Sequence, residues 1–117
     1  MASLAAIVEH SLSMIRYYGR RRPPVKTAVA LEYRRGRDRA PLVTASGRGE
    51  VAEQILSAAR EHGIHIEPDP DLALLLADVD LGQAIPPQLY GVVAEILSFV
   101  YKLNSARMPE TIGGDEG

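Results

Sequence analysis

Three histidines are the first residues of this chain that could carry chemistry: His10, His62 and His65. Imidazole can bind a metal ion or move a proton near neutral pH. His62 and His65 flank a glycine and have acidic neighbours, but their spacing matches none of the usual zinc patterns, and the chain has no cysteine. The dipole at a helix C-terminus is enough to explain His62. We therefore predict neither a metal site nor a bound cofactor.

The segment Ser46-Gly47-Arg48-Gly49 superficially resembles a phosphate-binding loop placed between a strand and a helix. It lacks the Lys-Ser/Thr pair of a P-loop and the three-glycine spacing of a dinucleotide fold. A helix N-terminus attracts anions weakly in any case. We predict that this segment starts a helix and caps it.

Four aspartates, at positions 69, 71, 78 and 80, form an acidic group in the second half of the chain. Asp69 and Asp71 precede an apolar run, where they can cap a helix and interact with its dipole. No nucleophile has a base beside it in the sequence, as acyl or phosphoryl transfer would require. The pattern therefore predicts a protein that is not an enzyme.

A chain of 117 residues and 12.7 kDa is long enough for one ordinary domain. Hydrophobic residues make up 46% and charged residues 24%, which favours a globular fold over disorder. The longest apolar run, residues 72–77, is far shorter than the ~18 residues of a membrane span. The first ten residues do not resemble a secretory signal. These features predict a cytoplasmic protein without a membrane span.

Charge is distributed unevenly along the chain. Residues 1–60 contain 11 Lys/Arg and 5 Asp/Glu, whereas residues 61–117 contain 2 and 10, which gives +6 and −8. Tyr17 and Tyr18 stand next to Arg20, Arg21 and Arg22, an arrangement found in single-strand nucleic-acid binders. The acidic second half opposes such binding, and no nucleic-acid motif is present. Nucleic-acid binding through residues 16–39 is therefore the alternative function, and we expect it less than solvated basic turns.

The first half reads as a helix followed by a hairpin. Apolar residues recur at helical spacing over residues 2–18, so we expect a helix there and a basic linker to residue 22. Residues 25–33 alternate as a strand, with small alanines on one side, where something should pack closely. The polar segment 34–39 and the apolar residues 40–45 complete a hairpin.

The second half reads as helices around one further strand. We expect a helix from residue 46 or 47 to 62, a strand at 64–66, a short helix at 71–78 and a last helix at 88–103. The crossover helix predicts that the strand at 64–66 runs parallel to a hairpin strand. Core residues are expected on the two later helices, at Leu72, Leu75, Leu76, Leu89, Val92, Val93, Ile96, Leu97, Val100 and Leu103. The fold class is α/β, with a small three- to four-stranded mixed sheet covered by helices.

One stretch is distinctive enough to identify a family. The segment LGQAIPPQLYGVVAEILSFVYKL, residues 81–103, closely resembles the C-terminal cytoplasmic domain of the FlhB family, the export-switch proteins of type III secretion. The upstream segments TAVALEY, APLVTASG and AAREHGIHI follow in the family's order and spacing. The resemblance covers about residues 23–103. It divides the chain into an N-terminal helix and linker (1–22), an FlhB-like domain (23–104) and a flexible tail (105–117).

The chain departs from this family in two respects. Its first 22 residues are unlike the large transmembrane half that precedes the domain in family members. The family also carries Asn-Pro-Thr-His before the first strand of the hairpin, and cuts itself between Asn and Pro. Those positions are Pro23, Pro24, Val25 and Lys26 here. Since the cut depends on attack by the Asn side-chain amide, we expect no self-cleavage.

The resemblance implies a non-cleaving, FlhB-like binding module of the flagellar or type III export system. Its implied partners are export-apparatus proteins, export substrates or the ruler protein that triggers the substrate switch. It would act in the cytoplasm or peripherally at the membrane export gate, in secretion or in substrate-specificity switching. The candidate partner-binding residues are those at the degenerate motif and on the hairpin: Pro23, Pro24, Lys26, Arg34, Arg35 and Arg37. A hydrophobic groove beside Leu72, Leu75 and Leu76 is a further candidate for accepting an export signal.

Overall fold

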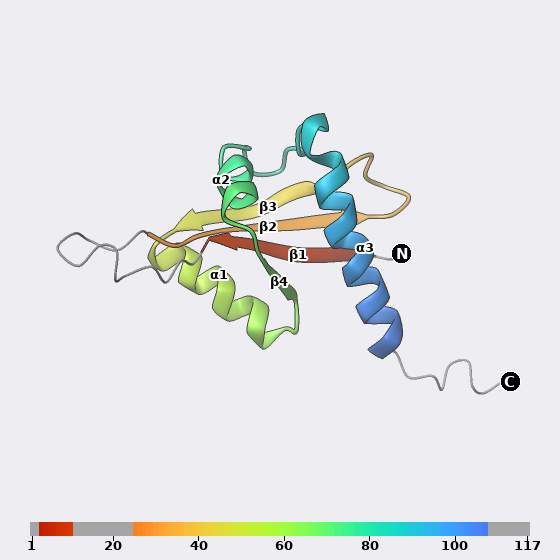
Figure 1. Cartoon of the computed structure of the whole chain (residues 1–117), viewed down its shortest axis with the longest axis horizontal. Coiled ribbons are helices and arrows are strands. Elements are labelled where there is room, and N and C mark those ends of the chain that lie inside the picture. The colour runs from red at the N-terminus through yellow and green to blue at the C-terminus, as the bar shows by residue number, and fades with distance from the viewer. Residues whose placement is uncertain (1–2, 11–24, 108–117) are drawn as a thin grey trace, which may run out of the picture.

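The computed structural model describes residues 3–10 and 25–107 as a four-stranded sheet with helices on both faces (Figure 1). Its elements follow in chain order, with a short 3₁₀ turn, Pro87–Leu89, leading directly into the last helix: β1 (Ser3–His10), β2 (Thr27–Arg34), β3 (Leu42–Arg48), α1 (Glu50–Glu61), β4 (His65–Pro68), α2 (Pro70–Leu76) and α3 (Tyr90–Arg107). The expected α/β class with a mixed sheet is confirmed.

The first strand lies in the middle of the sheet, whose order is β3-β2-β1-β4. β1 pairs antiparallel with β2, from Ser3 opposite Arg34 to His10 opposite Thr27, and parallel with β4 on its other side. The predicted helix over residues 2–18 is therefore wrong for residues 3–10, and its remainder lies outside the described residues. Residues 3–10 are an integral part of the sheet.

Burial on both faces explains why β1 has no clear alternation of apolar and polar residues. Leu4, Ala6 and Val8 enter the larger core, whereas Ile7 enters the smaller one. A central strand covered on both sides reads as a nearly continuous apolar run, and a short run of this kind does not distinguish strand from helix.

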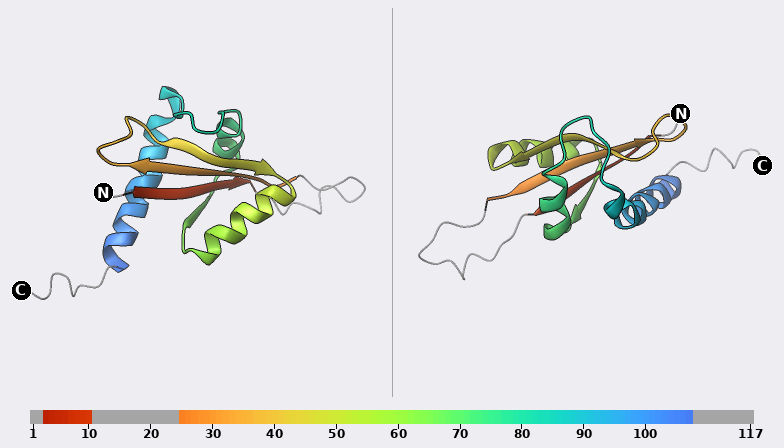
Figure 2. Two further views of the ribbon diagram at one scale, coloured as in Figure 1. Left: turned by 180° about the vertical axis from the view of Figure 1, so that it is seen from behind. Right: turned by 90° about the horizontal axis from the view of Figure 1, so that it is seen from above.

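The helices divide into two layers, which the view from above in Figure 2 separates clearly. α1 covers one face, where Ala52, Leu56 and Ala59 pack on Ile7 and Ala28. The close packing expected at the alanine face of β2 is thus confirmed. α2 and α3 cover the other face of the sheet. They form one core there with Ile85 and with the inward-facing residues of β1, β2 and β3.

β4 and the outer edge of β3 complete the sheet. β4 runs in the same direction as β3, as the crossover predicts, but its neighbour is β1 and not a hairpin strand. Residues 82–85 cover part of the β3 edge: Val43 N donates to Gln83 O (3.0 Å) and Gly82 N donates to Val43 O (2.7 Å). This contact places the chain entering α3 beside the start of β3.

Three details of the helices differ from the predictions. Ser46, Gly47 and Arg48 belong to β3, and Gly49, with φ 59°, precedes α1 without a side-chain cap. Leu75 is 55% exposed and Val92 is 37% exposed, so neither belongs to the core, whereas most other members of the two predicted core stripes are buried. α3 continues through residues 105–107, which we expected in the tail, and residues 108–117 lie outside the described part of the chain.

Candidate functional site

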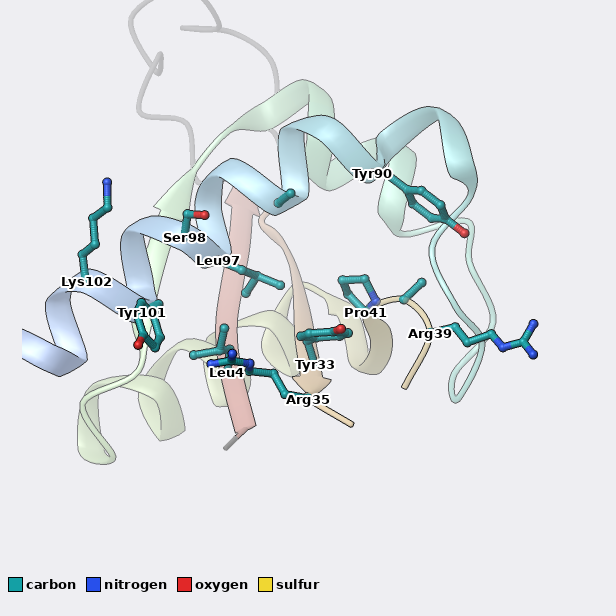
Figure 3. A pocket seen from close by; sticks show the side chains of 12 residues that line it. Leu4, Tyr33, Arg35, Arg39, Pro41, Tyr90, Leu97, Ser98, Tyr101 and Lys102 are labelled. Atoms are coloured by element: carbon teal, nitrogen blue, oxygen red, sulfur yellow. The ribbon is translucent and has the colours of Figure 1, made fainter. Parts of the chain in front are cut away.

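A groove of about 520 Å³ runs between α3 and the end of the β2–β3 hairpin (Figure 3). β1 contributes one side chain to it, the hairpin contributes five residues, and one side of α3 contributes the remainder. The lining consists of Leu4, Tyr33, Arg35, Arg39, Ala40, Pro41, Tyr90, Ala94, Leu97, Ser98, Tyr101 and Lys102. Aliphatic and aromatic side chains with a few cations are a composition suited to an apolar peptide segment.

α3 supplies its side of the groove through helical periodicity. Tyr90, Ala94, Leu97 and Tyr101 are separated by four, three and four residues, so they follow one face of the helix. Leu97 is buried beneath the groove, and Tyr90 and Tyr101 are about half exposed at its two ends. The extended backbone at Pro86 and the 3₁₀ turn that follows set the start of this helix.

Arg35 closes one end of the groove. Its guanidinium lies over the ring of Tyr101, with Cζ 5.6 Å from the ring centroid. This cation–π geometry links the end of β2 to α3. Arg39 and Lys102 place two further cations on the rim, and none of the twelve lining residues is acidic. The groove is therefore apolar inside and positive at its edge.

Arg34 fixes the hairpin turn and lies outside the groove lining. Its backbone N donates to Asp38 Oδ2 at 2.9 Å, and its guanidinium donates to both carboxylate oxygens at 3.2 Å. The Asp38 side chain is only 7% exposed. The hydrogen bond from the Arg34 side chain, helped by the one from its backbone N, lowers the pKa of the Asp38 carboxyl, and the same pair raises the pKa of Arg34.

The remaining predicted contact residues do not gather at one place. Lys26 lies just before β2, at the end opposite Arg35, and pairs with Glu53 of α1, whose pKa the Lys26 hydrogen bond lowers. Arg37 is exposed in the turn, and Pro23 and Pro24 lie outside the described residues. Of the predicted residues that the structure describes, Arg35 alone lines the groove.

The histidines His62 and His65 have local partners. His62 Nδ1 lies 2.9 Å from Ala58 O at the C-terminal end of α1, where we expected this residue. His65 Nε2 lies 2.8 Å from Glu67 Oε1, and its ring meets Phe99 edge-on at 5.1 Å. Within residues 3–10 and 25–107, no group of three or more metal-ligating side chains is assembled.

The sequence reading missed the tyrosines and Pro41 of the groove. We interpreted Pro41 only as the start of a strand and the apolar residues of α3 only as core. The available signal was a second stripe on the same helix, formed by Tyr90, Ala94 and Tyr101 beside the buried residues. The groove beside Leu72 and Leu76 that we expected does not coincide with this site, because both side chains are buried in the core.

Comparison with known sequences assigns this fold to a family. The sequence profile of the FlhB HrpN YscU SpaS family matches residues 22–100, more than half of the chain. The chain belongs to this family. Leu97 and every hairpin residue that lines the groove fall within the matched region, and Tyr101 and Lys102 lie just beyond it.

Relatives in this family differ greatly in length. The YlqH protein of Bacillus subtilis is 42% identical over 83 residues, which cover 71% of this chain and 89% of YlqH. FlhB of Aquifex aeolicus, a flagellar biosynthetic protein, is 38% identical over 78 residues, 66% of this chain but only 22% of that protein. The chain thus spans about a fifth of the length of FlhB.

Solved structures of the family share the fold. The cytoplasmic domain of FlhB from Shewanella putrefaciens superposes with a TM-score of 0.69 at 31% identity, covering 87% of this chain and 73% of that one. A variant of the EscU C-terminal domain gives 0.66 at 26% identity, covering 81% and 83%. In the described part of this chain, no helix is both long and apolar enough to cross a bilayer.

Proposed function

We propose that this protein is a non-catalytic binding module of the flagellar or type III export system. It acts in the cytoplasm or at the cytoplasmic side of the export gate, and holds an extended, partly apolar segment of an exported protein in the groove beside α3. The observation that supports this most directly is the groove itself, which is apolar within and carries Arg35, Arg39 and Lys102 at its rim. Family membership supplies the export context.

The expected affinity is modest. Burying one large apolar side chain contributes about 1.5–3 kcal/mol, and ordering the bound peptide offsets part of this. A segment with two apolar anchors and one or two acidic neighbours would then bind with a Kd on the order of 10 μM to 1 mM. Weak binding suits a protein that must pass its ligand onward.

Two modes of action agree with a chain that spans about a fifth of FlhB. The module would stand in for the corresponding domain of a full-length relative, or it would act beside that domain and present substrates to it. Participation in the substrate-specificity switch, through the ruler protein, belongs to the first mode. Both modes require the same groove.

The absence of self-cleavage is part of the proposal. Proline at position 23 has no side-chain amide that could attack its own carbonyl carbon, and Lys26 is engaged with Glu53 of α1. The bond between Pro23 and Pro24 therefore stays intact, and any switching would depend on what occupies the groove.

Three of the basic residues that the nucleic-acid alternative would use already have partners in the fold. Lys26 pairs with Glu53, Arg34 pairs with Asp38, and Arg35 lies over Tyr101. A phosphate backbone would have to compete with these contacts.

The proposal is tested by affinity purification from the native cells with a tagged full-length chain. We compare Ala94→Glu, which puts bulk and negative charge into the groove, with Leu75→Glu, which places the same side chain at an exposed apolar position of α2 outside the groove. Export-apparatus components and exported proteins are quantified by mass spectrometry, with and without nuclease.

We expect Ala94→Glu to reduce their recovery at least about tenfold, the effect of roughly 1.4 kcal/mol of binding free energy, while Leu75→Glu leaves it unchanged. Equal recovery with all three chains would refute the groove as the docking site. Recovery that disappears with nuclease would favour the nucleic-acid alternative instead.

A further inference from the structure

We propose that the last part of β3, residues 46–48, is a second docking site, where a neutral, extended segment of a partner protein adds a strand to the sheet. In Figure 1 the arrowhead of β3 marks this end of the strand. The groove lies at the other end, where Ala40 and Pro41 precede β3. The two sites share no residue, so this inference does not depend on the proposed function of the groove.

The main-chain groups of Ser46 and Arg48 point away from the sheet. Lys26 O accepts a hydrogen bond from the residue that follows β3 (2.9 Å), so the polar groups of Lys26, and of every second residue after it, face β3. Those of Thr27 and Val29 face β1 instead, and their partners on β3 are Arg48 and Ser46. In such a pair both residues direct their N–H and C=O groups away from each other. This end of β3 therefore presents unpaired donors and acceptors at its outer edge.

The first part of the same edge is already covered by the chain itself. Residues 82–85 lie along it, and Val43 N donates to Gln83 O at 3.0 Å. In the described part of the chain, no residue donates to or accepts from the outward main-chain groups of Ser46 and Arg48. An edge with unpaired N–H and C=O groups is a template for a further strand. The pairing that residues 82–85 begin could thus continue with a segment of another protein.

The opposite edge of the sheet is protected, in contrast. Asp69 N donates to Glu9 O at 3.1 Å, so the alternation along β4 makes Ile66 and Pro68 its outward-facing residues. Pro68 has no N–H, which leaves the one of Ile66 as the single outward donor within β4. Proline at an edge is a common device against unwanted pairing. Of the two edges of this sheet, the end of β3 is the better suited to accept a strand.

Aliphatic side chains border the open edge on both faces of the sheet. On one face Leu74 of α2, which is 43% exposed, lines a hollow of about 410 Å³. On the other face Val51 of α1, which is 49% exposed, packs against Gly47. Successive side chains of an added strand point to opposite faces, so neighbouring residues would cover Leu74 and Val51 in turn. The hollow is lined by Ser46, Gly47, Arg48, Leu74, Ala77 and Asp78.

The charges at this site balance, which indicates the chemistry of the partner. Arg48 and Asp78 line the same hollow and together carry no net charge. A polyanion such as a nucleic acid gains little at a site of this kind, because its binding depends on clustered cations. The partner is therefore an aliphatic segment without excess charge. Its affinity comes from main-chain hydrogen bonds and from contacts with Val51 and Leu74, and β-branched residues suit such a strand best.

A phage-displayed library of random peptides, roughly nine residues long, tests this inference by selection on the tagged full-length chain. Selected peptides are synthesised, and their affinities are measured by fluorescence anisotropy for the natural chain and three variants. Leu74→Glu places a charge beside the open edge. Leu75→Glu places the same side chain at the next position of α2, which is exposed and outside the hollow, and Ala94→Glu changes the groove. Urea unfolding checks that each variant is folded.

We expect a class of aliphatic peptides whose affinity falls at least about tenfold with Leu74→Glu and is unchanged with Leu75→Glu and Ala94→Glu. Because the site is neutral, their affinity should change by less than about twofold between low salt and about 0.5 M NaCl. A selection that yields no peptide, or only peptides that bind Leu74→Glu as well as the natural chain, would overturn the proposal.

Methylation of single main-chain nitrogens in a selected peptide separates strand addition from a contact made by side chains alone. Every second N–H of an added strand faces β3, so methyl groups at these positions should reduce the affinity at least about tenfold, and those at the positions between them by less than about twofold. Equal effects along the peptide would refute strand addition. Self-association of the natural chain that Leu74→Glu abolishes would also overturn the proposal, and would assign the edge to a second copy.

Discussion

The guanidinium of Arg35 lies over the aromatic ring of Tyr101, 5.6 Å from its centroid, and joins the end of β2 to the second half of α3. Arg34, its neighbour, makes its ion pair with Asp38 in the turn. Two adjacent arginines thus serve two different purposes, one in the groove and one in the hairpin.

Replacing Arg35 should therefore affect binding more than folding. We expect Arg35→Ala to lower the free energy of unfolding by no more than about 1 kcal/mol, as for an exposed cation–π contact. Recovery of export proteins should fall severalfold. Arg37→Ala, in the same turn but outside the groove, is the matched control and should leave both unchanged. Identical recovery with the two variants would remove Arg35 from the site.

Gly47 is required by its contact with α1. A Cβ added there would overlap Val51 Cγ1 and lie 2.6 Å from Val51 Cβ. We expect Gly47→Ala to cost about 1–3 kcal/mol in urea unfolding, because the β-branched valine on a helix has little freedom to move away.

The double variant Gly47→Ala/Val51→Ala should recover at least about half of that loss, since the clashing atoms are gone. Val51 is half exposed, so Val51→Ala alone should cost little. A double variant as unstable as Gly47→Ala would show that the strain arises elsewhere.

The Arg34–Asp38 pair should make stability depend on pH in the acidic range. The pKa of Asp38 is lowered in the folded chain, so its ionised form contributes stability above its unfolded value, about 3.9. That contribution is lost as the pH falls through the lower folded value. Asp38→Asn should reduce the melting temperature at pH 7 and have little effect near pH 2. Asp80→Asn, at an exposed position, should change it little at either pH; a pH-independent effect of Asp38→Asn would contradict the assignment.

Intact mass should show one uncut chain for the natural sequence. Restoring the family's motif with Pro23→Asn, Val25→Thr and Lys26→His gives the side-chain amide and the imidazole back, and we expect a cut before Pro24. The fragments should stay together in gel filtration, because β1 is paired with both β2 and β4. The Lys26→His single variant is the control and should remain intact.

The secondary structure could be predicted from the sequence where neighbouring residues determine it. The hairpin, α1, α2 and α3 follow from periodicity, prolines and glycines near them, and the fold family followed from residues 81–103. β1 was misread because Leu4, Ile7 and Val8 fit a helical stripe as well as a strand buried on both faces. This segment is a strand because it pairs with β2 and β4, which are distant in sequence.

The groove was unpredictable for the same physical reason. Tyr33 belongs to β2, Pro41 directly precedes β3 and Tyr101 belongs to α3, so only the packing of α3 on the sheet brings them together. Val92 and Tyr101 differ little from core residues in sequence, and their exposure depends on the angle at which α3 crosses the strands.

The central place of β1 has a consequence for synthesis on the ribosome. β2 and β3 form a local hairpin, but among the described strands β4 pairs only with β1, so this four-stranded sheet is complete only after residue 68 has left the exit tunnel. Until then the earliest strand has an unpaired edge, and its apolar face awaits α2 and α3. Folding of this small domain is therefore governed by contacts between distant parts of the chain, which predicts slower folding than its helical content alone would suggest.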